Sequence, residues 1–339
     1  MRHPPYHLRL NKAVDRLTLM DAIDRLRNLS ALSEYTYYGL GGPYLEEFRL
    51  LYESHPEMAM VSIENDKETF KRQAFHLPCG NVRIERESLR SFLARYEPVD
   101  RKCIFWLDYT GLEYSCFEDF QVLLRKAVAG SMVKITLRAE PRDYYTELQE
   151  PVANLSRIGS NHEVSRPAPV LRDEKADQFR EKFRAIMPNP SATPPATLAG
   201  LASMLQGMLR IAAQEELRGA VGIIFQPISS FHYNDGTGMF TFTGLLCMRS
   251  EEAKVREAFG NWAFANLDWA DPLQIDVPTL STKERLHLQR WLPCQDSPGE
   301  TLRLKLGYMI GNGKKDTEAL LGQYAVFHRR FPYFMRGIP

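Results

Sequence analysis

The 339-residue sequence lacks the features typical of membrane proteins, secreted proteins and proteins stabilised by a structural metal ion. It has no run of 18 or more apolar residues, so no segment is apolar and long enough to span a bilayer as a helix. Its five cysteines form no CxxC pair, which argues against a disulfide framework and a structural zinc site. Residues 1–10 contain no apolar core of a signal peptide. We therefore expect a soluble, cytoplasmic protein with reduced thiols, no bound metal and no membrane partner.

The overall charge and composition are those of a globular protein. There are 43 Lys and Arg residues against 42 Asp and Glu, and 44% of the residues are apolar. These values exclude a disordered chain and a collagen-like chain. The length suits one large α/β domain with additions, or two domains.

The two ends of the chain are nevertheless basic. Residues 301–339 hold seven Lys or Arg and two acidic residues, a net charge of +5, and residues 1–30 carry +3. Aromatic residues interleave with the C-terminal basic ones. This pattern suits phosphate contacts and base stacking, which makes Lys314, Lys315, Arg329 and Arg330 candidate contacts with RNA or DNA. The pattern equally fits a docked helix whose aromatic rings are buried and whose Lys and Arg side chains are exposed to solvent. The aromatic residues are Tyr308, Tyr324, Phe327, Phe331, Tyr333 and Phe334.

Short β-prone runs alternate with segments of helical periodicity over residues 35–140. An amphipathic helix is expected first, over residues 11–29. Strands alternating with helices of about ten residues predict βαβ units and a parallel sheet covered on both faces. The expected strands are 35–38, 58–63, 81–84, 102–107 and 132–137, and the expected helices after them are 44–53, 67–76, 88–96 and 117–129.

The remaining residues predict an insertion and a closing hairpin. Residues 141–198 are rich in Pro, Asn and Ser and contain one helix at 173–186, as an insertion would. A helix at 198–217 precedes a β-hairpin that turns at Asn234-Asp235-Gly236. A capping box, Ser281 with Glu284, begins a helix over 281–292. The predicted segments are 1–34 (lead helix), 35–140 and 199–248 (α/β domain), 141–198 (insertion) and 249–339 (basic, mostly helical).

Polar residues and glycines follow the predicted strands, where open parallel sheets bind ligands. Gly39, Gly41 and Gly42 follow the first strand, and their lack of a Cβ atom lets a ligand approach the backbone. Glu64 follows the second strand, where a carboxylate can accept both hydroxyls of a ribose. Each residue alone also has a structural explanation, since glycines form turns and acids cap helices. Their order along the chain favours a nucleoside-binding site.

The third and fourth strands add the remaining candidates. Glu87 and Ser88 follow the third strand, at a place suited to an adenine edge. Asp108 and Tyr109 follow the fourth strand, where a reacting group would lie. Two simpler motifs yield no site: His232-Tyr233-Asn234-Asp235 fits a hairpin turn, and Gly311–Lys315 lacks phosphate-loop spacing.

This order of motifs resembles the class I S-adenosylmethionine-dependent methyltransferase fold over residues 35–140 and 199–248. The resemblance implies a doubly wound, mostly parallel seven-stranded sheet that ends in an antiparallel strand. It implies S-adenosylmethionine as cofactor, with Gly39, Gly41 and Gly42 at the methionine part, Glu64 at the ribose, Glu87 and Ser88 at the adenine, and Asp108 beside the methyl group. The acid usual before the glycine turn is absent, since Tyr35-Thr36-Tyr37-Tyr38 stands there.

The segment after the fourth strand is also similar to the Asp-Pro-Phe-Gly loop of tRNA guanine-N2 dimethyltransferases. Asp108-Tyr109-Thr110-Gly111 keeps the Asp and the Gly and lacks the Pro. By this likeness Asp108 would orient an amino group and Tyr109 would stack on a flat base. The competing interpretation is that Asp108 caps the next helix and Tyr109 packs in the core.

Three functions remain open from the sequence. The first is methyl transfer from S-adenosylmethionine to a nucleic-acid base or another bulky acceptor. The second is a methyltransferase-like fold without catalysis, acting with a protein partner as a binding or regulatory subunit of a bacterial multi-protein system; the missing acid before the glycine turn favours it. The third is a nicotinamide-dependent oxidoreductase, against which Tyr44 occupies the last glycine position of a GxGxxG motif.

Overall fold

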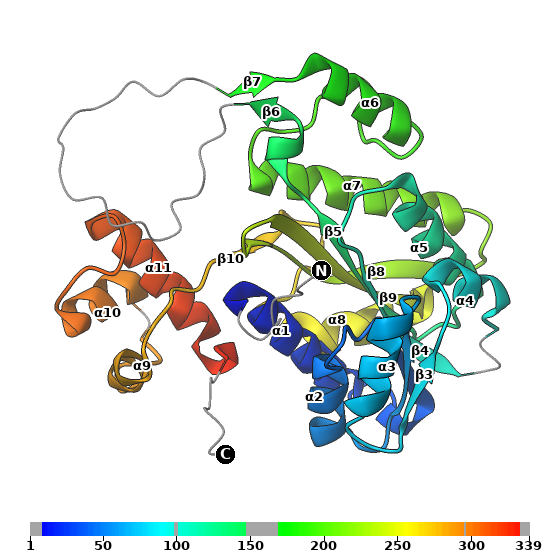
Figure 1. Ribbon diagram of the computed structural model, residues 1–339, viewed down its shortest axis with the longest axis horizontal. Helices are drawn as coiled ribbons and strands as arrows, with labels where there is room; N and C mark the ends of the chain where they lie inside the picture. The colour runs from blue at the N-terminus through cyan, green and yellow to red at the C-terminus, as the bar shows by residue number, and fades with distance from the viewer. Residues whose placement is uncertain (1–8, 98–100, 147–168, 295, 333–339) are drawn as a thin grey trace.

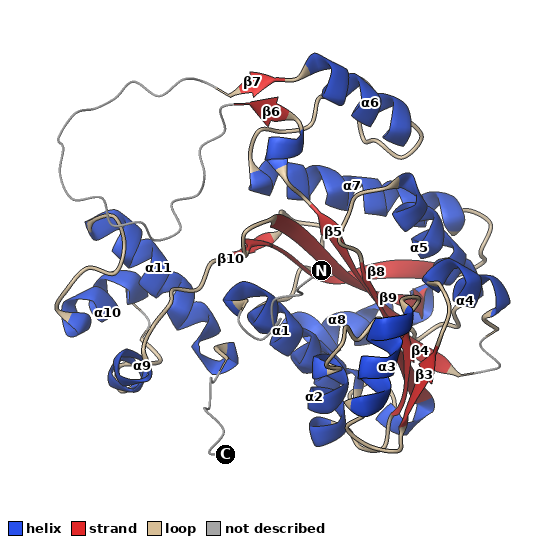
Figure 2. Cartoon of the chain, viewed as in Figure 1, coloured by secondary structure: helices blue, strands red, loops and turns tan. Residues whose placement is uncertain are grey.

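The computed structural model describes residues 9–97, 101–146, 169–294 and 296–332. A single large sheet forms its centre, with helices on both sides and a group of three C-terminal helices beside it (Figure 1, Figure 2). Tyr333, Phe334 and Arg336, which contribute to the predicted basic tail, lie outside the described residues.

The central sheet has eight described strands in the order β10-β8-β9-β5-β4-β1-β2-β3. Strands β1 to β5 are parallel, β9 is antiparallel to β5, and β10 lies parallel to β8 at the edge. This is the predicted doubly wound sheet closed by an antiparallel strand, with β10 as an eighth strand beyond the seven expected. The strands are β1 Tyr35–Gly39, β2 Ala59–Ile63, β3 Val82–Glu85, β4 Lys102–Asp108, β5 Met132–Arg138, β8 Ile223–Asn234, β9 Gly238–Met248 and β10 Leu273–Ile275.

The helices lie close to their predicted positions. Helix α2 begins two residues late, because Leu45 has a left-handed backbone (φ +52°) that a helix cannot include. The capping box of Ser281 and Glu284 is present at the start of α9. The helices are α1 Leu10–Leu26, α2 Glu46–Ser54, α3 Lys67–Phe75, α4 Leu89–Arg95, α5 Tyr114–Lys126, α6 Asp173–Phe183, α7 Leu198–Glu216, α8 Glu252–Gly260, α9 Thr282–Gln289, α10 Pro298–Leu306 and α11 Lys314–Phe327.

Both faces of the sheet are buried because alternate residues of each strand enter opposite cores. In β4, Ile104 and Trp106 join the core that contains α1, α2 and α8, whereas Phe105 and Leu107 join the core that contains α4, α5 and α7. The insertion adds α6 and a small sheet of β6 (Tyr145–Thr146) and β7 (Val170–Leu171), drawn at the top of Figure 1.

Helix α1 departs from the expected amphipathic pattern, since the charged residues of its first two turns are buried with its apolar ones. Asn11, Lys12, Asp15 and Arg16 are each at most 8% exposed. Nζ of Lys134, on β5, donates to Oδ1 of Asp15 at 2.7 Å, and both side chains are at most 1% exposed. Burial lowers the pKa of Lys134, and the carboxylate of Asp15 opposes that effect. The ion pair therefore ties α1 to the middle of the sheet.

The tip of the β8–β9 hairpin holds the N-terminal end of α1. The Asp235 carboxylate accepts hydrogen bonds from the backbone N–H groups of Asn11 (3.3 Å) and Lys12 (2.8 Å), which are two unpaired donors of the helix start. The turn is formed as predicted, with Gly236 at φ +92°. The structure thus adds a helix-capping role to a sequence that predicted turn formation alone.

Lys134→Met should lower the free energy of unfolding by about 3–5 kcal/mol, because it leaves the Asp15 charge buried without its partner. Denaturation in urea measures this change. The double variant Asp15→Leu with Lys134→Met removes both charges and should recover most of the loss. A single variant within about 1 kcal/mol of the wild type would contradict the role of the pair.

Asp235→Ala should lower the free energy of unfolding by about 1–2 kcal/mol, since it removes the cap of α1. Asp235→Asn is the matched control, because its side-chain oxygen still accepts a hydrogen bond from the helix start. Thermal or urea unfolding of the two variants gives the comparison. Equal stability of Asp235→Ala and Asp235→Asn would show that the hairpin tip contributes only its turn.

Candidate functional site

A cavity of about 650 Å³ opens at the carboxyl ends of β1, β2 and β4, the edge where the sequence predicts a ligand site. We call it the strand-end cavity. Helix α1 and the first turns of α2 and α3 complete its walls. It is lined by Lys12, Arg16, Leu40, Gly41, Gly42, Pro43, Tyr44, Glu46, Glu47, Glu64, Asp66, Glu68, Thr69, Arg72, Trp106, Asp108 and Thr110.

The glycine loop after β1 is held tightly against its surroundings. Gly41 and Gly42 have positive φ angles of 64° and 53°, which favour glycine. A Cβ atom on Gly41 would lie 2.5 Å from Leu45 Cδ2, so no side chain fits there. Nε2 of Gln73 donates to the carbonyl oxygens of Leu40 and Gly42, both at 3.0 Å. The loop therefore presents a fixed backbone to the cavity, whereas Gly39 ends β1 outside the lining.

Two acids that the sequence analysis missed lie at the start of α2. Nη1 of Arg16 pairs with Oε2 of Glu46 at 2.9 Å, and its Nε lies 4.0 Å from Oε2 of Glu47. Burial raises the pKa of Glu47, and Arg16 opposes that effect. Burial raises the pKa of the hydroxyl of Tyr37, the residue two positions before Gly39, and the Glu47 charge raises it further. An acid thus stands beside the glycine loop, although it comes from α2 and not from β1.

Glu64 lies at the end of β2, in the cavity lining, as the strand-end rule predicts. Its Oε1 accepts a hydrogen bond from the backbone N–H of Asp66 at 2.7 Å, and Asp66 in turn caps α3 by accepting from the Thr69 N–H at 2.8 Å. Nη2 of Arg72 donates to the Tyr44 hydroxyl at 2.7 Å, which closes this side of the cavity. The Glu64 carboxylate is therefore oriented by the backbone that follows it.

Asp108 and Tyr109 point in opposite directions. Asp108 ends β4 on the face of Trp106 and lines the cavity, where its Oδ2 accepts a hydrogen bond from Lys12 Nζ at 2.7 Å. The Tyr109 hydroxyl donates to Oδ2 of Asp119, on α5, at 2.9 Å. Burial raises the pKa of Tyr109. Since successive side chains of a strand face opposite sides, the two neighbours cannot both face the cavity, and Tyr109 packs with the α5 core.

Glu87 and Ser88 lie beyond β3, outside the cavity lining. Arg95 binds Oε1 of Glu87 through its Nε at 3.0 Å and through a second nitrogen. The Ser88 hydroxyl oxygen caps α4 by accepting from the Ser91 N–H at 3.1 Å. Both Arg95 contacts go to Oε1, which leaves Oε2 of Glu87 to accept from another donor. The predicted adenine contacts of these two residues remain a prediction.

The charged residues of the cavity wall are mostly acidic. Six carboxylates face three basic groups, so the lining is more negative than positive, and Trp106 adds an apolar surface. Such a lining favours a ligand with net positive charge. The acids are Glu46, Glu47, Glu64, Asp66, Glu68 and Asp108, and the bases are Lys12, Arg16 and Arg72. In the described part of the chain, no three His, Cys, Asp or Glu side chains are grouped to hold a metal ion.

The predicted nucleic-acid contacts lie on α11 and just after it, where the interleaved aromatic rings are buried. Tyr324, Phe327 and Phe331 are at most 2% exposed. Arg330 pairs with Asp21 of α1 at 2.5 Å, and Lys314 lies 3.8 Å from Glu318. Lys315 and Arg329 are exposed. The buried rings are therefore parts of the core here and cannot stack on bases, as the second interpretation of this tail expected.

The sequence analysis also missed the α1 residues of the cavity, although a signal for them existed. Lys134 stands inside the apolar strand sequence MVKITL, where a buried lysine needs an acidic partner. Lys12, Asp15 and Arg16 share one side of α1 by their spacing of three and four residues. What the sequence could not show is that this side faces β4 and β5.

Comparisons with known proteins bear on the family of the chain. None of the curated proteins matches the sequence. Among solved structures, Trm1 from Pyrococcus horikoshii in complex with S-adenosyl-L-methionine is 13% identical, with 73% of this chain and 57% of that chain covered and a TM-score of 0.43. TYW2 from the same organism in complex with MeSAdo is 10% identical, with 66% and 61% covered and a TM-score of 0.32. The chain spans less than two thirds of the length of these solved chains.

A family model matches almost the whole chain. The family is described as "Putative O-methyltransferase", and the match covers residues 4–338. It favours the methyltransferase interpretation over the oxidoreductase one. No helix among the described residues is long and apolar enough to cross a membrane. On the strength of this match, the chain belongs to that family.

Proposed function

We propose that this protein transfers a methyl group from S-adenosylmethionine to an oxygen atom of an acceptor, with the cofactor in the strand-end cavity. The observation that carries the proposal is the convergence of three elements on one cavity. The glycine loop, Glu64 and Asp108 come from the ends of three parallel strands, and all line it. The description of the family supports oxygen as the methylated atom.

The residues present fit the cofactor in size and in charge. A cavity of about 650 Å³ lies in the range that encloses cofactor-sized ligands. S-adenosylmethionine carries an ammonium group, a sulfonium group and a carboxylate, and so has net positive charge. The predominantly acidic lining complements that charge, and Arg16 and Lys12 are available for the carboxylate.

Individual residues then take distinct roles. The backbone at Gly41 and Gly42 has no side chain to keep a ligand away, so it would contact the methionine part. The Glu64 carboxylate would accept hydrogen bonds from the ribose hydroxyls. Oε2 of Glu87 would accept from the adenine amino group, if the adenine extends past the end of β3.

Methyl transfer requires mainly that the protein position the acceptor and the methyl donor. When bound, the cofactor supplies an electrophilic methyl group on sulfur. The chain must hold the acceptor oxygen in line with that group and remove its proton. Asp108 is the carboxylate at the end of β4, 29% exposed, and it can accept this proton. Lys12 holds the carboxylate at 2.7 Å and is thus a positioning residue for it.

A nucleic-acid base was predicted as the acceptor from Tyr109 and the basic tail. Because the Tyr109 ring packs toward α5, it offers no stacking surface in the cavity. The nucleic-acid acceptor therefore stays a prediction, with Lys314, Lys315 and Arg329 as its exposed basic contacts, whereas Arg330 pairs with Asp21.

Glu64→Ala should weaken S-adenosylmethionine binding by roughly 1.5–3 kcal/mol, the range for losing a hydrogen bond to a charged group. Calorimetric titration measures it. Glu68→Ala is the matched control, since Glu68 lines the same cavity and pairs outward with Lys71. Unchanged affinity in Glu64→Ala would refute the ribose contact. If the wild type binds neither S-adenosylmethionine nor S-adenosylhomocysteine nor NAD, the result would favour the non-catalytic alternative.

Asp108→Asn should lower kcat by on the order of 10²-fold or more, with cofactor affinity largely unchanged, because it removes the proton acceptor and keeps the shape. Single-turnover methylation of an accepted substrate measures the rate. Asp66→Asn is the control, since Asp66 also lines the cavity but caps α3, a role that Asn fills equally well. Wild-type turnover by Asp108→Asn would end the proposed role of this carboxylate.

A further inference from the structure

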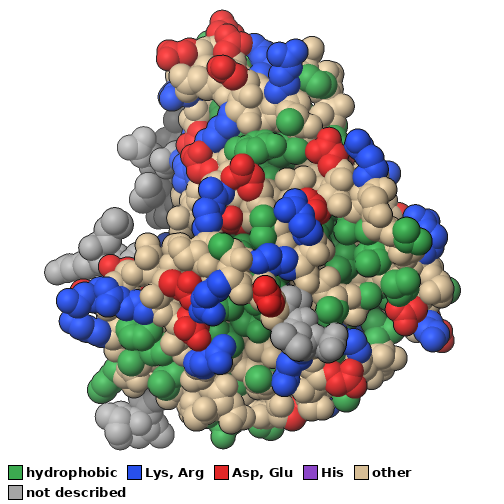
Figure 3. Space-filling model, turned by 90° about the vertical axis from the view of Figure 1, so that its right-hand side faces the viewer, with side chains coloured by type: hydrophobic (Ala, Val, Ile, Leu, Met, Phe, Trp, Pro, Cys, Tyr) green, Lys and Arg blue, Asp and Glu red, His purple; other side chains and the backbone are tan. Residues whose placement is uncertain are grey.

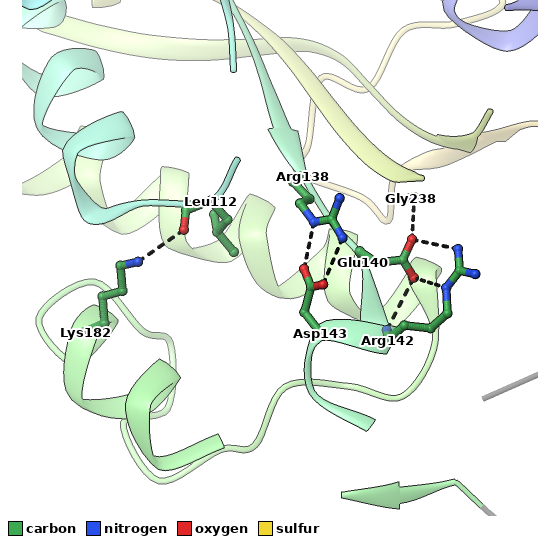
Figure 4. A network of polar contacts seen from close by, with 7 residues as sticks. All are labelled: Leu112, Arg138, Glu140, Arg142, Asp143, Lys182 and Gly238. Atoms are coloured by element: carbon green, nitrogen blue, oxygen red, sulfur yellow. Dashed lines mark hydrogen bonds and ion pairs between the residues drawn. The ribbon is translucent and has the colours of Figure 1, made fainter. Parts of the chain in front are cut away.

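A second hollow of about 410 Å³ lies between α6 and the segments that follow β4 and β5. We call it the basic pocket. Figure 4 shows part of its wall, where Lys182 reaches from α6 toward Leu112 and Arg142 and Asp143 lie opposite. It is lined by Leu112, Arg142, Asp143, Tyr144, Arg172, Lys175, Gln178, Phe179, Lys182 and Phe183.

Four of these ten residues are basic, and the one acid is already bound. Arg138 holds both carboxylate oxygens of Asp143, at 2.7 and 2.8 Å, as Figure 4 shows. Arg142 binds Glu140 and Lys182 binds Glu113, so these two bases are partly neutralised. Arg172 and Lys175 are exposed and pair with no carboxylate among the described residues. The basic pocket therefore has an excess of positive charge at its rim.

The basic rim contrasts with the mixed charge on another face of the molecule. On the face of the molecule that Figure 3 shows, Lys and Arg side chains alternate with Asp and Glu, and no large area carries one sign. The chain as a whole has a formal charge of only +1. General surface charge therefore does not account for the basic rim.

The floor of the basic pocket is aromatic. The Tyr144 ring meets the Phe179 ring edge to face at 5.2 Å, and Phe179 packs against Phe183 at 4.8 Å. Phe179 and Phe183 are at most 2% exposed, and Tyr144 is half-buried. An apolar floor beneath Arg and Lys side chains suits a ligand with an apolar body and an anionic end.

The basic pocket lies close to Asp108 along the same edge of the sheet. Asp108 and Thr110 line the strand-end cavity, and Leu112 lines the basic pocket. Four residues of extended chain span at most about 14 Å, which limits the separation of Asp108 from Leu112. The backbone N–H of Tyr109 donates to Thr136 O at 3.0 Å, and that of Arg138 donates to Gly111 O at 3.3 Å, so β5 fixes this segment.

We propose that the basic pocket binds the anionic group of the methyl acceptor, a carboxylate or a phosphate, with the adjoining apolar part of that molecule on the Tyr144 floor. The link to the acceptor rests on the proposed function. The binding of an anion does not, because it involves Arg172 and Lys175 of α6 and its start, which lie outside the strand-end cavity. An acceptor held in this way would present its hydroxyl toward Asp108 and its charge away from the acidic cofactor cavity.

The test titrates the full chain, without cofactor, with benzoate, with the neutral isostere benzamide and with inorganic phosphate by calorimetry. Benzoate should bind with a Kd on the order of 1 mM. Benzamide should bind more weakly than benzoate by about tenfold or more. The double variant Arg172→Gln with Lys175→Gln should weaken benzoate binding by about tenfold or more. Both side chains are exposed, so the melting temperature of this variant should match that of the wild type.

The charge-matched control is Lys254→Gln with Lys283→Gln, two exposed lysines on α8 and α9 that should leave benzoate binding unchanged. Equal benzoate binding by the wild type and the Arg172/Lys175 variant would overturn the proposal, as would no binding of either anion. Phosphate binding as tight as benzoate binding would overturn the role of the aromatic floor. Because no cofactor is present, these outcomes are independent of whether S-adenosylmethionine binds.

Discussion

The buried ion pair between Asp15 and Lys134 is the constraint on which the strand-end cavity depends. Two buried charges are tolerated only when they lie in direct contact with each other. The Asp15–Lys134 pair therefore fixes the position of α1 along the sheet. Lys12 and Arg16 lie on the same side of α1 as Asp15, and that position brings them to Asp108 and Glu46. A polar contact inside the core thereby sets the geometry of the cavity wall.

Most of the fold was predictable because its signals are local. Apolar runs such as 102–107 specify buried strands, the glycine loop ends the first of them, and the turn at Gly236 specifies the closing hairpin. The eighth strand, β10, was not predicted, since three residues with two exposed side chains carry too little pattern. The docking of α1 was missed for another reason. Its charged side chains gave an ordinary surface pattern, and their burial is explained only by distant partners such as Lys134 and Asp108.

The site was predictable as far as strand order determines it. Parallel strands bring their carboxyl ends to one edge, so Gly41, Glu64 and Asp108 lie in one cavity as the sequence implied. Side-chain direction was harder to foresee. Tyr109 follows Asp108 and points to the other face, and Glu87 is bound by Arg95. Glu46 and Glu47 were missed because they enter from a helix that no strand-end rule covers.

The hairpin cap also has a consequence for the order of events during synthesis. Lys12 is separated from Asp235 by 223 residues, and Asp21 from Arg330 by 309. At ribosomal rates of about 5–20 residues per second, the residues between Lys12 and Asp235 take roughly 11–45 s to synthesise. The charged partners of Lys12 and Asp15, which are Asp108 and Lys134, are made earlier, but until residue 235 is made the backbone N–H groups of Asn11 and Lys12 lack their acceptor. The nascent N-terminal segment, which carries the glycine loop and Glu64, therefore lacks the hairpin contact that holds the start of α1 until residue 235 has been made.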